Sequence, residues 1–248
     1  MKLLLNKWNK FLTEKKLSTC TQQVERGEII TLSGRTKVYM SDRSGKYDEI
    51  ILYFHGQGSS SNKIKPLIGA LQQTTSVMLI VPNLGTRPQD MARGDMPGVS
   101  PGYLQNIFNQ LIQKNCFKGT RIHAAASPLK AYGHSAGGMA LTTFLVRNLE
   151  YVTEARYLDA SYRNWGGVIV DNAGGNLSKI YFVTGDNPNK VPYKNAKKYF
   201  EKGANWCISN KNHRQIAYIL GPLPSCVNKS PKEKEKESPK KGDVPNVV

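Results

Sequence analysis

Residues 129–145 read LKAYGHSAGGMALTTFL, and this stretch joins a strand-like run to a helix-like run. The apolar first part ends at Gly133, and the helix-like part begins at Met139. Between them, residues 133–137 fit the pattern G-x-S-x-G. Small residues around the serine let the strand and the helix approach without clashing, and the helix N-terminus directs free N–H groups toward whatever the serine attacks. The stretch predicts a nucleophilic Ser135; the alternative is a glycine-rich turn with an inert serine.

The rest of the chain alternates strand-like and helix-like segments. Nearly continuous apolar runs predict buried strands, while apolar residues at helical spacing predict helices. A hairpin of residues 28–32 and 36–40, joined at Ser33-Gly34, comes first. Strands are then expected at 49–54, 77–81, 155–158 and 180–184, and helices at 62–73, 102–114, from Ser135 to about Asn148, 193–203 and 213–220. This order predicts an α/β fold with a mostly parallel sheet and right-handed crossovers.

Composition divides the chain into three parts. The 248 residues are 39% hydrophobic, which suits one globular α/β domain over residues 21–226. Residues 1–20 hold a short amphipathic pattern, which predicts a helix that packs on this domain or on a partner or membrane surface. Residues 227–248 are rich in lysine, glutamate and proline, and they predict a disordered tail.

The chain is strongly basic, with a formal net charge of +17. Such a charge favours anionic partners such as an acidic lipid surface or a cell-wall polymer; the alternative is a solvated basic surface without a partner. No zinc-finger spacing, RNP-like pattern or basic helix indicates a specific nucleic-acid reader. No apolar run is long enough for a membrane helix or for the core of a signal peptide, which favours the cytoplasm and leaves export open.

Four cysteines occur, Cys20, Cys116, Cys207 and Cys226, and no two of them form a C-x-x-C pair. Neither a metal site nor a redox motif is therefore expected. Cys207 and Cys226 would form a disulfide in an exported protein, but reduced thiols are the favoured expectation.

Three places together resemble the α/β-hydrolase superfamily: residues 53–58 (YFHGQG), the turn at Ser135, and the late His213. The resemblance spans roughly residues 48–220. It implies a central sheet flanked by helices, and a serine hydrolase of the esterase or lipase kind.

A serine nucleophile needs a base and a carboxylate that orients the base, and this family carries them in the order Ser, acid, His. The histidines are His55, His123, His134 and His213. Only His213 follows Ser135, so it is the predicted base. Its alternative is an exposed loop histidine.

Three aspartates after Ser135 each end an apolar run and are candidates for the acid. The sequence Leu158-Asp159-Ala160 looks like the turn that carries the acid in pancreatic-type lipases, so Asp159 is the first choice. Asp186, after the penultimate strand expected, is the second. Asp171 is third, because a turn role beside the following Asn and Gly residues accounts for it better.

In the resembling family, the turn after the first buried strand donates a backbone N–H to the oxyanion. By position Gln57 takes this role, with Gly58 as the runner-up, and Ala136 supplies the second N–H. His55 is expected to pin the loop as a structural side chain.

The predicted reaction is acyl transfer to Ser135 followed by hydrolysis, with a carboxylic ester as substrate. The same chemistry would serve an amidase, a peptidase or an acyltransferase. A non-catalytic binding module for an anionic partner is the alternative from another class. No residue pattern indicates a metal or an organic cofactor.

Overall fold

The computed structural model describes residues 20–25, 27–44, 46–71, 76–84, 102–116 and 128–227. The expected N-terminal helix, residues 85–101 and the lysine-rich tail beyond residue 227 lie outside these ranges. Residues 20–25 are helical.

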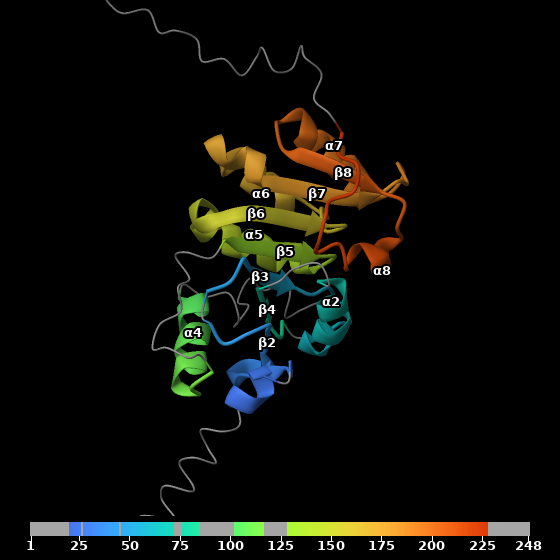
Figure 1. Cartoon of the computed structure of the whole chain (residues 1–248). Helices are drawn as coiled ribbons and strands as arrows, with labels where there is room; N and C mark the ends of the chain where they lie inside the picture. The colour runs from blue at the N-terminus through green and yellow to red at the C-terminus, as the bar shows by residue number, and fades with distance from the viewer. Residues whose placement is uncertain are drawn as a thin grey trace, which may run out of the picture.

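An eight-stranded sheet forms the centre of the molecule, with the strand order β1-β2-β4-β3-β5-β6-β7-β8 (Figure 1). The strands are β1 (Ile30–Thr31), β2 (Lys37–Met40), β3 (Glu49–Phe54), β4 (Val77–Val81), β5 (Leu129–His134), β6 (Val152–Leu158), β7 (Ile180–Gly185) and β8 (Asn205–Ser209). β2 runs antiparallel to both of its neighbours, and all pairs from β4 through β8 are parallel. This is the order of the α/β-hydrolase fold, so the predicted fold class is confirmed.

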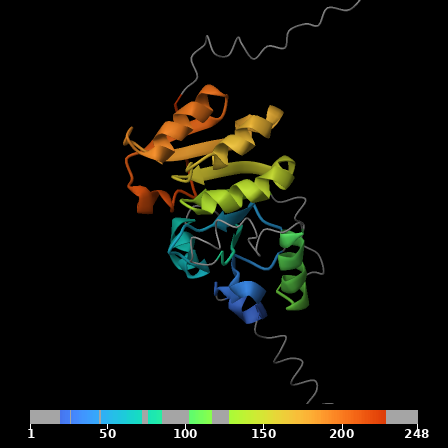
Figure 2. The ribbon, with the colours of Figure 1, turned by 180° about the vertical axis from the view of Figure 1, so that it is seen from behind.

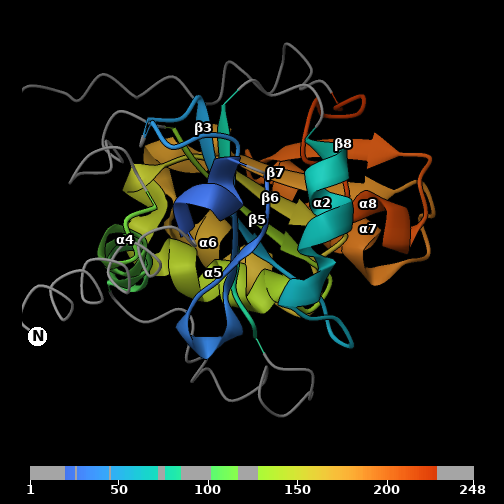
Figure 3. The same ribbon diagram turned by 60° about the horizontal axis from the view of Figure 1, so that its bottom comes forward.

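Helices cover the two faces of the sheet unequally. They are α2 (Ile64–Ala70), α4 (Tyr103–Gln113), α5 (Gly137–Asn148), α6 (Trp165–Asn172), α7 (Val191–Glu201) and α8 (His213–Ile216). One apolar core packs the sheet against α4, α5, α6 and α7, and the view from behind brings α5, α6 and α7 forward (Figure 2). A second core lies on the other face under α2 and α8, which lie side by side (Figure 3).

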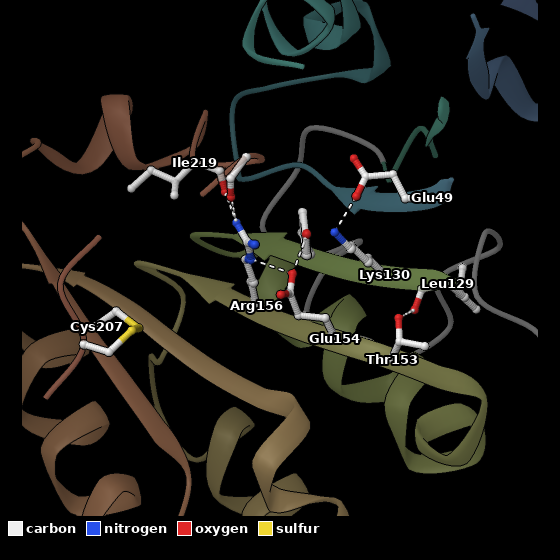
Figure 4. A network of polar contacts seen from close by, with 11 residues as sticks. Glu49, Leu129, Lys130, Thr153, Glu154, Arg156, Cys207 and Ile219 are labelled. Atoms are coloured by element: carbon white, nitrogen blue, oxygen red, sulfur yellow. Dashed lines mark hydrogen bonds and ion pairs between the residues drawn. A yellow bond between two sulfur atoms is a disulfide. The ribbon is translucent and has the colours of Figure 1, made fainter. Parts of the chain in front are cut away.

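A buried arginine holds the segment that follows α8 against this second face (Figure 4). Arg156 of β6 is 3% exposed, and its Nε donates to Glu154 Oε1 at 2.7 Å. Its Nη1 donates to the carbonyls of Ile219 and Gly221 at 3.0 and 2.7 Å. The chain thereby crosses from α8 over β6 before it returns to the edge of β8, where the Val227 amide donates to the Trp206 carbonyl.

The strands confirm the sequence analysis more closely than the last helices do. β3 and β4 have the predicted bounds, and β1 pairs with β2 as the predicted hairpin. α6 was not predicted, because its eight residues, WGGVIVDN, have two glycines in the first turn and present only a short apolar run. α8 ends at Ile216 rather than near residue 220, where the chain turns toward Arg156.

The expectation of reduced cysteines is wrong. Cys20 is bonded to Cys116, and Cys207 is bonded to Cys226. Cys226 returns as an antiparallel bridge partner of Cys207 on β8, a proximity that only the folded chain produces.

Candidate active site

Ser135 lies in a strained turn at the carboxyl end of β5. Its φ is 52°, in the left-handed region that non-glycine residues seldom adopt. The Ser135 amide donates to the Leu158 carbonyl of the neighbouring strand at 3.2 Å, and α5 begins two residues later at Gly137. The turn holds the serine at the carboxyl end of the central strand β5, which lies between β3 and β6.

Two glycines allow the close approach on which this turn depends. A Cβ atom at Gly137 would lie 2.2 Å from the Phe54 carbonyl oxygen of β3. A Cβ atom at Gly56 would lie 2.9 Å from the Ser135 Cβ. Gly137 of the motif and Gly56 of the turn after β3 are therefore required by backbone packing around the serine.

Asp159 and His213 form a hydrogen-bonded pair beside this turn. Asp159 follows β6, has a φ of 45°, and its Oδ2 lies 2.5 Å from His213 Nδ1. His213 is the first residue of α8, which Asn212 and Gln215 cap reciprocally. Because Nδ1 contacts the carboxylate, Nε2 is the ring nitrogen left to exchange a proton with a substrate or with the serine.

Neither of the two other candidate aspartates is hydrogen-bonded to His213 in the described structure. Asp186 is exposed after β7, and no hydrogen bond between it and His213 occurs in the described structure. Asp171 belongs to the last turn of α6 and pairs with Lys202, so its interpretation as a turn residue is wrong. The apolar run before Asp171, residues 168–170, is part of α6 and not a strand.

Ser135 and His213 line one cavity of about 390 Å³, together with Gly56, Gln57 and Gly58 from the turn after β3. Both side chains are described, and no hydrogen bond joins the serine hydroxyl to the imidazole. Catalytic hydrogen bonds are often long before a substrate binds, so this geometry suits a resting site.

The predicted oxyanion residues lie at either side of the serine. Gln57 stands in a turn between β3 and α2, and Ala136 connects Ser135 to α5. Within the described ranges, neither backbone amide has a hydrogen-bond acceptor. Two free amides near the nucleophile are available to a developing negative charge.

His55 is fully occupied by backbone contacts. It is 1% exposed; the Leu84 amide donates to its Nε2 at 3.1 Å, which makes Nδ1 the protonated nitrogen and the donor to the Gly56 carbonyl at 3.0 Å. Burial lowers the pKa of His55, which keeps the ring neutral. These contacts agree with the predicted structural role.

His134 is a site residue to which the sequence analysis assigned no role. Its Nε2 donates to the His213 carbonyl at 2.9 Å, and the two ring centroids are 4.7 Å apart. Burial lowers the pKa of His134 to about 4. A neutral imidazole therefore packs under His213 and holds its backbone. The only sequence signal was its place inside G-x-S-x-G.

A second cavity of about 500 Å³ lies on the other side of His213, lined by Asp159, Asp186 and Tyr162 among others. The Tyr162 ring stands edge-on to the His213 ring, with centroids 6.5 Å apart. Burial, reinforced by Asp159, raises the pKa of Tyr162 to about 12, so its hydroxyl stays protonated. His213 thus borders both cavities.

The described residues contain no group of three or more His, Cys, Asp or Glu side chains arranged to hold a metal ion. Among the same residues, no helix has the length and apolar character needed to cross a membrane.

Solved structures similar to this chain include several hydrolases. A dienelactone hydrolase from Anabaena variabilis is 14% identical with a TM-score of 0.49, over 78% of this chain and 89% of that chain. A feruloyl esterase module from Clostridium thermocellum, in complex with sinapinate, is 20% identical with a TM-score of 0.46, over 71% of this chain and 70% of that chain. An S-formylglutathione hydrolase from Agrobacterium tumefaciens is 11% identical with a TM-score of 0.46, over 76% and 88% of the two chains. No protein-family model and no curated protein matches the sequence.

Proposed function

We propose that this protein is a serine hydrolase that cleaves carboxylic esters through an acyl-enzyme on Ser135. The observation that carries the proposal is the contact between Asp159 Oδ2 and His213 Nδ1 at the wall of the cavity that also contains Ser135. A serine, a histidine and a carboxylate in this chain order are the elements that activate a hydroxyl nucleophile.

The first half of the reaction acylates the serine. His213 Nε2 takes the proton of the Ser135 hydroxyl as Oγ forms a bond to the ester carbonyl carbon. The bond from that carbon to the alcohol oxygen then breaks, and His213 gives the proton to the departing alkoxide. Asp159 orients the imidazole and stabilises its charged form through the contact at Nδ1.

The second half repeats these steps with water as the nucleophile. Water gives a proton to His213 and adds to the acyl carbon; the bond to Ser135 Oγ breaks, and the serine recovers the proton. The products are a carboxylic acid and an alcohol. The free amides of Gln57 and Ala136 are the proposed donors to the oxyanion in both halves.

Labelling with a fluorophosphonate probe tests the nucleophile. We expect the wild-type protein and a Ser178→Ala control to be labelled, since Ser178 is exposed and does not line the cavity. Ser135→Ala should abolish labelling, and His213→Ala should slow it strongly. A panel of esters and matched amides would then identify the bond cleaved. Equal labelling of Ser135→Ala and the wild type would refute the proposal.

A further inference from the structure

Two basic side chains from two separate helical segments line the Ser135 cavity. Lys63 ends the short 3-10 helix η2 (Ser61–Lys63) that leads into α2, and Arg214 is the second residue of α8. α2 and α8 lie side by side on the same face of the sheet (Figure 3). Among the described residues that line this cavity, none is an aspartate or a glutamate.

Neither of these two cations is neutralised by a neighbour. Within the described structure, no ion pair or side-chain hydrogen bond involves Lys63 or Arg214, although both are exposed. Some basic residues elsewhere have an acidic partner: Lys130 pairs with Glu49, Arg156 with Glu154, and Lys202 with Asp171. The cavity beside the nucleophile therefore keeps two positive charges without a partner.

The second cavity is a useful contrast. It also carries two lysines, Lys190 and Lys211, but Asp159 and Asp186 line it as well. The Ser135 cavity thus differs from the second cavity, because no carboxylate among the described lining residues accompanies its two positive charges.

We propose that the substrate is an ester that carries an anionic group, a carboxylate or a phosphate, which Lys63 and Arg214 bind together in this cavity. This inference rests on the proposed ester hydrolysis at Ser135. A guanidinium binds such groups through two parallel hydrogen bonds, and an ammonium adds a compact charge. A cleft lined by charges of one sign also raises the local concentration of ligands of the opposite sign.

Two pairs of esters test this proposal on either side of the scissile bond. On the acyl side, the 4-nitrophenyl monoester of adipic acid is compared with 4-nitrophenyl hexanoate. On the alcohol side, 4-butyryloxybenzoate, which is anionic, is compared with methyl 4-butyryloxybenzoate, which is neutral. We expect the wild-type protein to prefer the anionic member of at least one pair by about tenfold or more in kcat/KM. Lys63→Gln and Arg214→Gln should each remove most of that preference, through a higher KM for the anionic ester.

Lys65→Gln and Arg147→Gln are the matched controls, because both residues are exposed and lie outside the cavity lining. Each control removes the same unit of net charge, and each should keep the preference.

Equal cleavage of the charged and neutral esters would overturn the inference and leave the proposed hydrolase intact. A loss of preference in the controls equal to that in the cavity variants would also overturn it, since net charge would then be the cause. Labelling of Ser135 without cleavage of any of the four esters overturns it too. Absence of both cleavage and labelling would remove the proposed function, and the inference with it.

Discussion

Ser135 and Asp159 have backbones of the same unusual kind. Both are non-glycine residues with positive φ, and each directly follows a parallel strand. Each amide donates to the next strand of the sheet, Ser135 to the Leu158 carbonyl and Asp159 to the Val183 carbonyl. These bonds hold conformations that cost about 1–3 kcal/mol each in an unconstrained chain. The strain places both side chains at the carboxyl edge of the sheet, where His213 meets Asp159.

Replacing the two candidate acids separately should distinguish them. Asp159→Asn should lower kcat for a cleaved ester by about 10³–10⁴-fold, because an amide no longer holds His213 in the required tautomer. Asp186→Asn should change kcat less than about twofold, since Asp186 makes no hydrogen bond to His213 in the described structure. Steady-state kinetics of the two variants checks this. The opposite ranking would transfer the role of the acid to Asp186.

Acid should destabilise the fold through His134. Its pKa is about 4 in the folded protein and ordinarily about 6.5, so between these values the unfolded chain binds more protons. Above pH 6.5 the neutral His134 ring does not lower the free energy of unfolding. As the pH falls from 6.5 toward 4, the free energy of unfolding decreases, by about 3 kcal/mol at most.

Urea unfolding of the wild type and His134→Gln at pH 7 and pH 4.5 measures this loss. The variant should lose less stability than the wild type, because glutamine can still donate to the His213 carbonyl but does not titrate. Some loss should persist in the variant, since the pKa of buried His55 is lowered as well. Identical losses in the two proteins would show that His134 does not contribute.

At the scale of elements, the site depends on how closely α5 crosses the end of β3. Gly137 begins α5 with its Cα facing the carbonyls of Phe54 and His55. Both carbonyl oxygens are backbone atoms in or beside a buried strand, so they have little freedom to move. This contact sets the distance between the nucleophile turn and the Gln57 turn.

Gly137→Ala should therefore destabilise the protein by about 3 kcal/mol or reduce its soluble yield, because the new methyl group would overlap backbone atoms. The matched control is Gly69→Ala in α2, where a Cβ atom would have nothing within 4 Å. That change should stabilise its helix by about 0.5–1 kcal/mol. Urea denaturation followed by circular dichroism compares the two. A Gly137→Ala variant as stable as the wild type would contradict the packing described here.

The position of the segment after α8 depends on the hydrogen bonds from Arg156. Arg156→Met should cost about 3 kcal/mol, since it leaves the carbonyls of Ile219 and Gly221 without their donor and Glu154 without its cation. Arg147→Met, at an exposed site on α5, should change stability by less than about 0.5 kcal/mol. Chemical denaturation of both variants gives the comparison, and equal effects would show that the network in Figure 4 contributes little.

At the scale of the whole molecule, two disulfides tie outlying segments to the sheet. Cys20–Cys116 joins the helix at residues 20–25 to the chain just after α4 and closes a span of 96 residues. Cys207–Cys226 fastens the end of the described chain to β8 across 19 residues. Both segments cover the edges of the fold, at β1 and β2 on one side and β8 on the other.

Both disulfides should be detectable and unequal in effect. Iodoacetamide should modify no cysteine of the unreduced protein and all four after reduction in denaturant. Replacing Cys20 and Cys116 by alanine should cost about 4–5 kcal/mol, and replacing Cys207 and Cys226 about 3 kcal/mol, because the longer loop restricts the unfolded chain more. Mass spectrometry and urea titrations provide the measurements. Full alkylation before reduction would refute the pairing.

Local patterns in the sequence determined much of the fold. Apolar runs such as EIILYF at residues 49–54 and VMLIV at 77–81 predicted β3 and β4 with their observed bounds, since a strand buried on both faces has to be continuously apolar. The G-x-S-x-G motif predicted the strand, turn and helix around Ser135, because backbone packing there excludes larger residues. Chain order alone left His213 as the single histidine after that serine.

The tertiary structure decided what depends on distant residues. Asp159 and His213 are 54 positions apart, and three aspartates after Ser135 had similar local settings. Only the sheet order shows that Asp159 reaches His213 while Asp171 belongs to a surface helix. The disulfides, the role of His134 and the unpaired charges of Lys63 and Arg214 emerged in the same way. Periodicity and turn chemistry reflect interactions between residues that are close along the chain. A site is formed by residues that are close in space, and the packing of the sheet determines which residues these are.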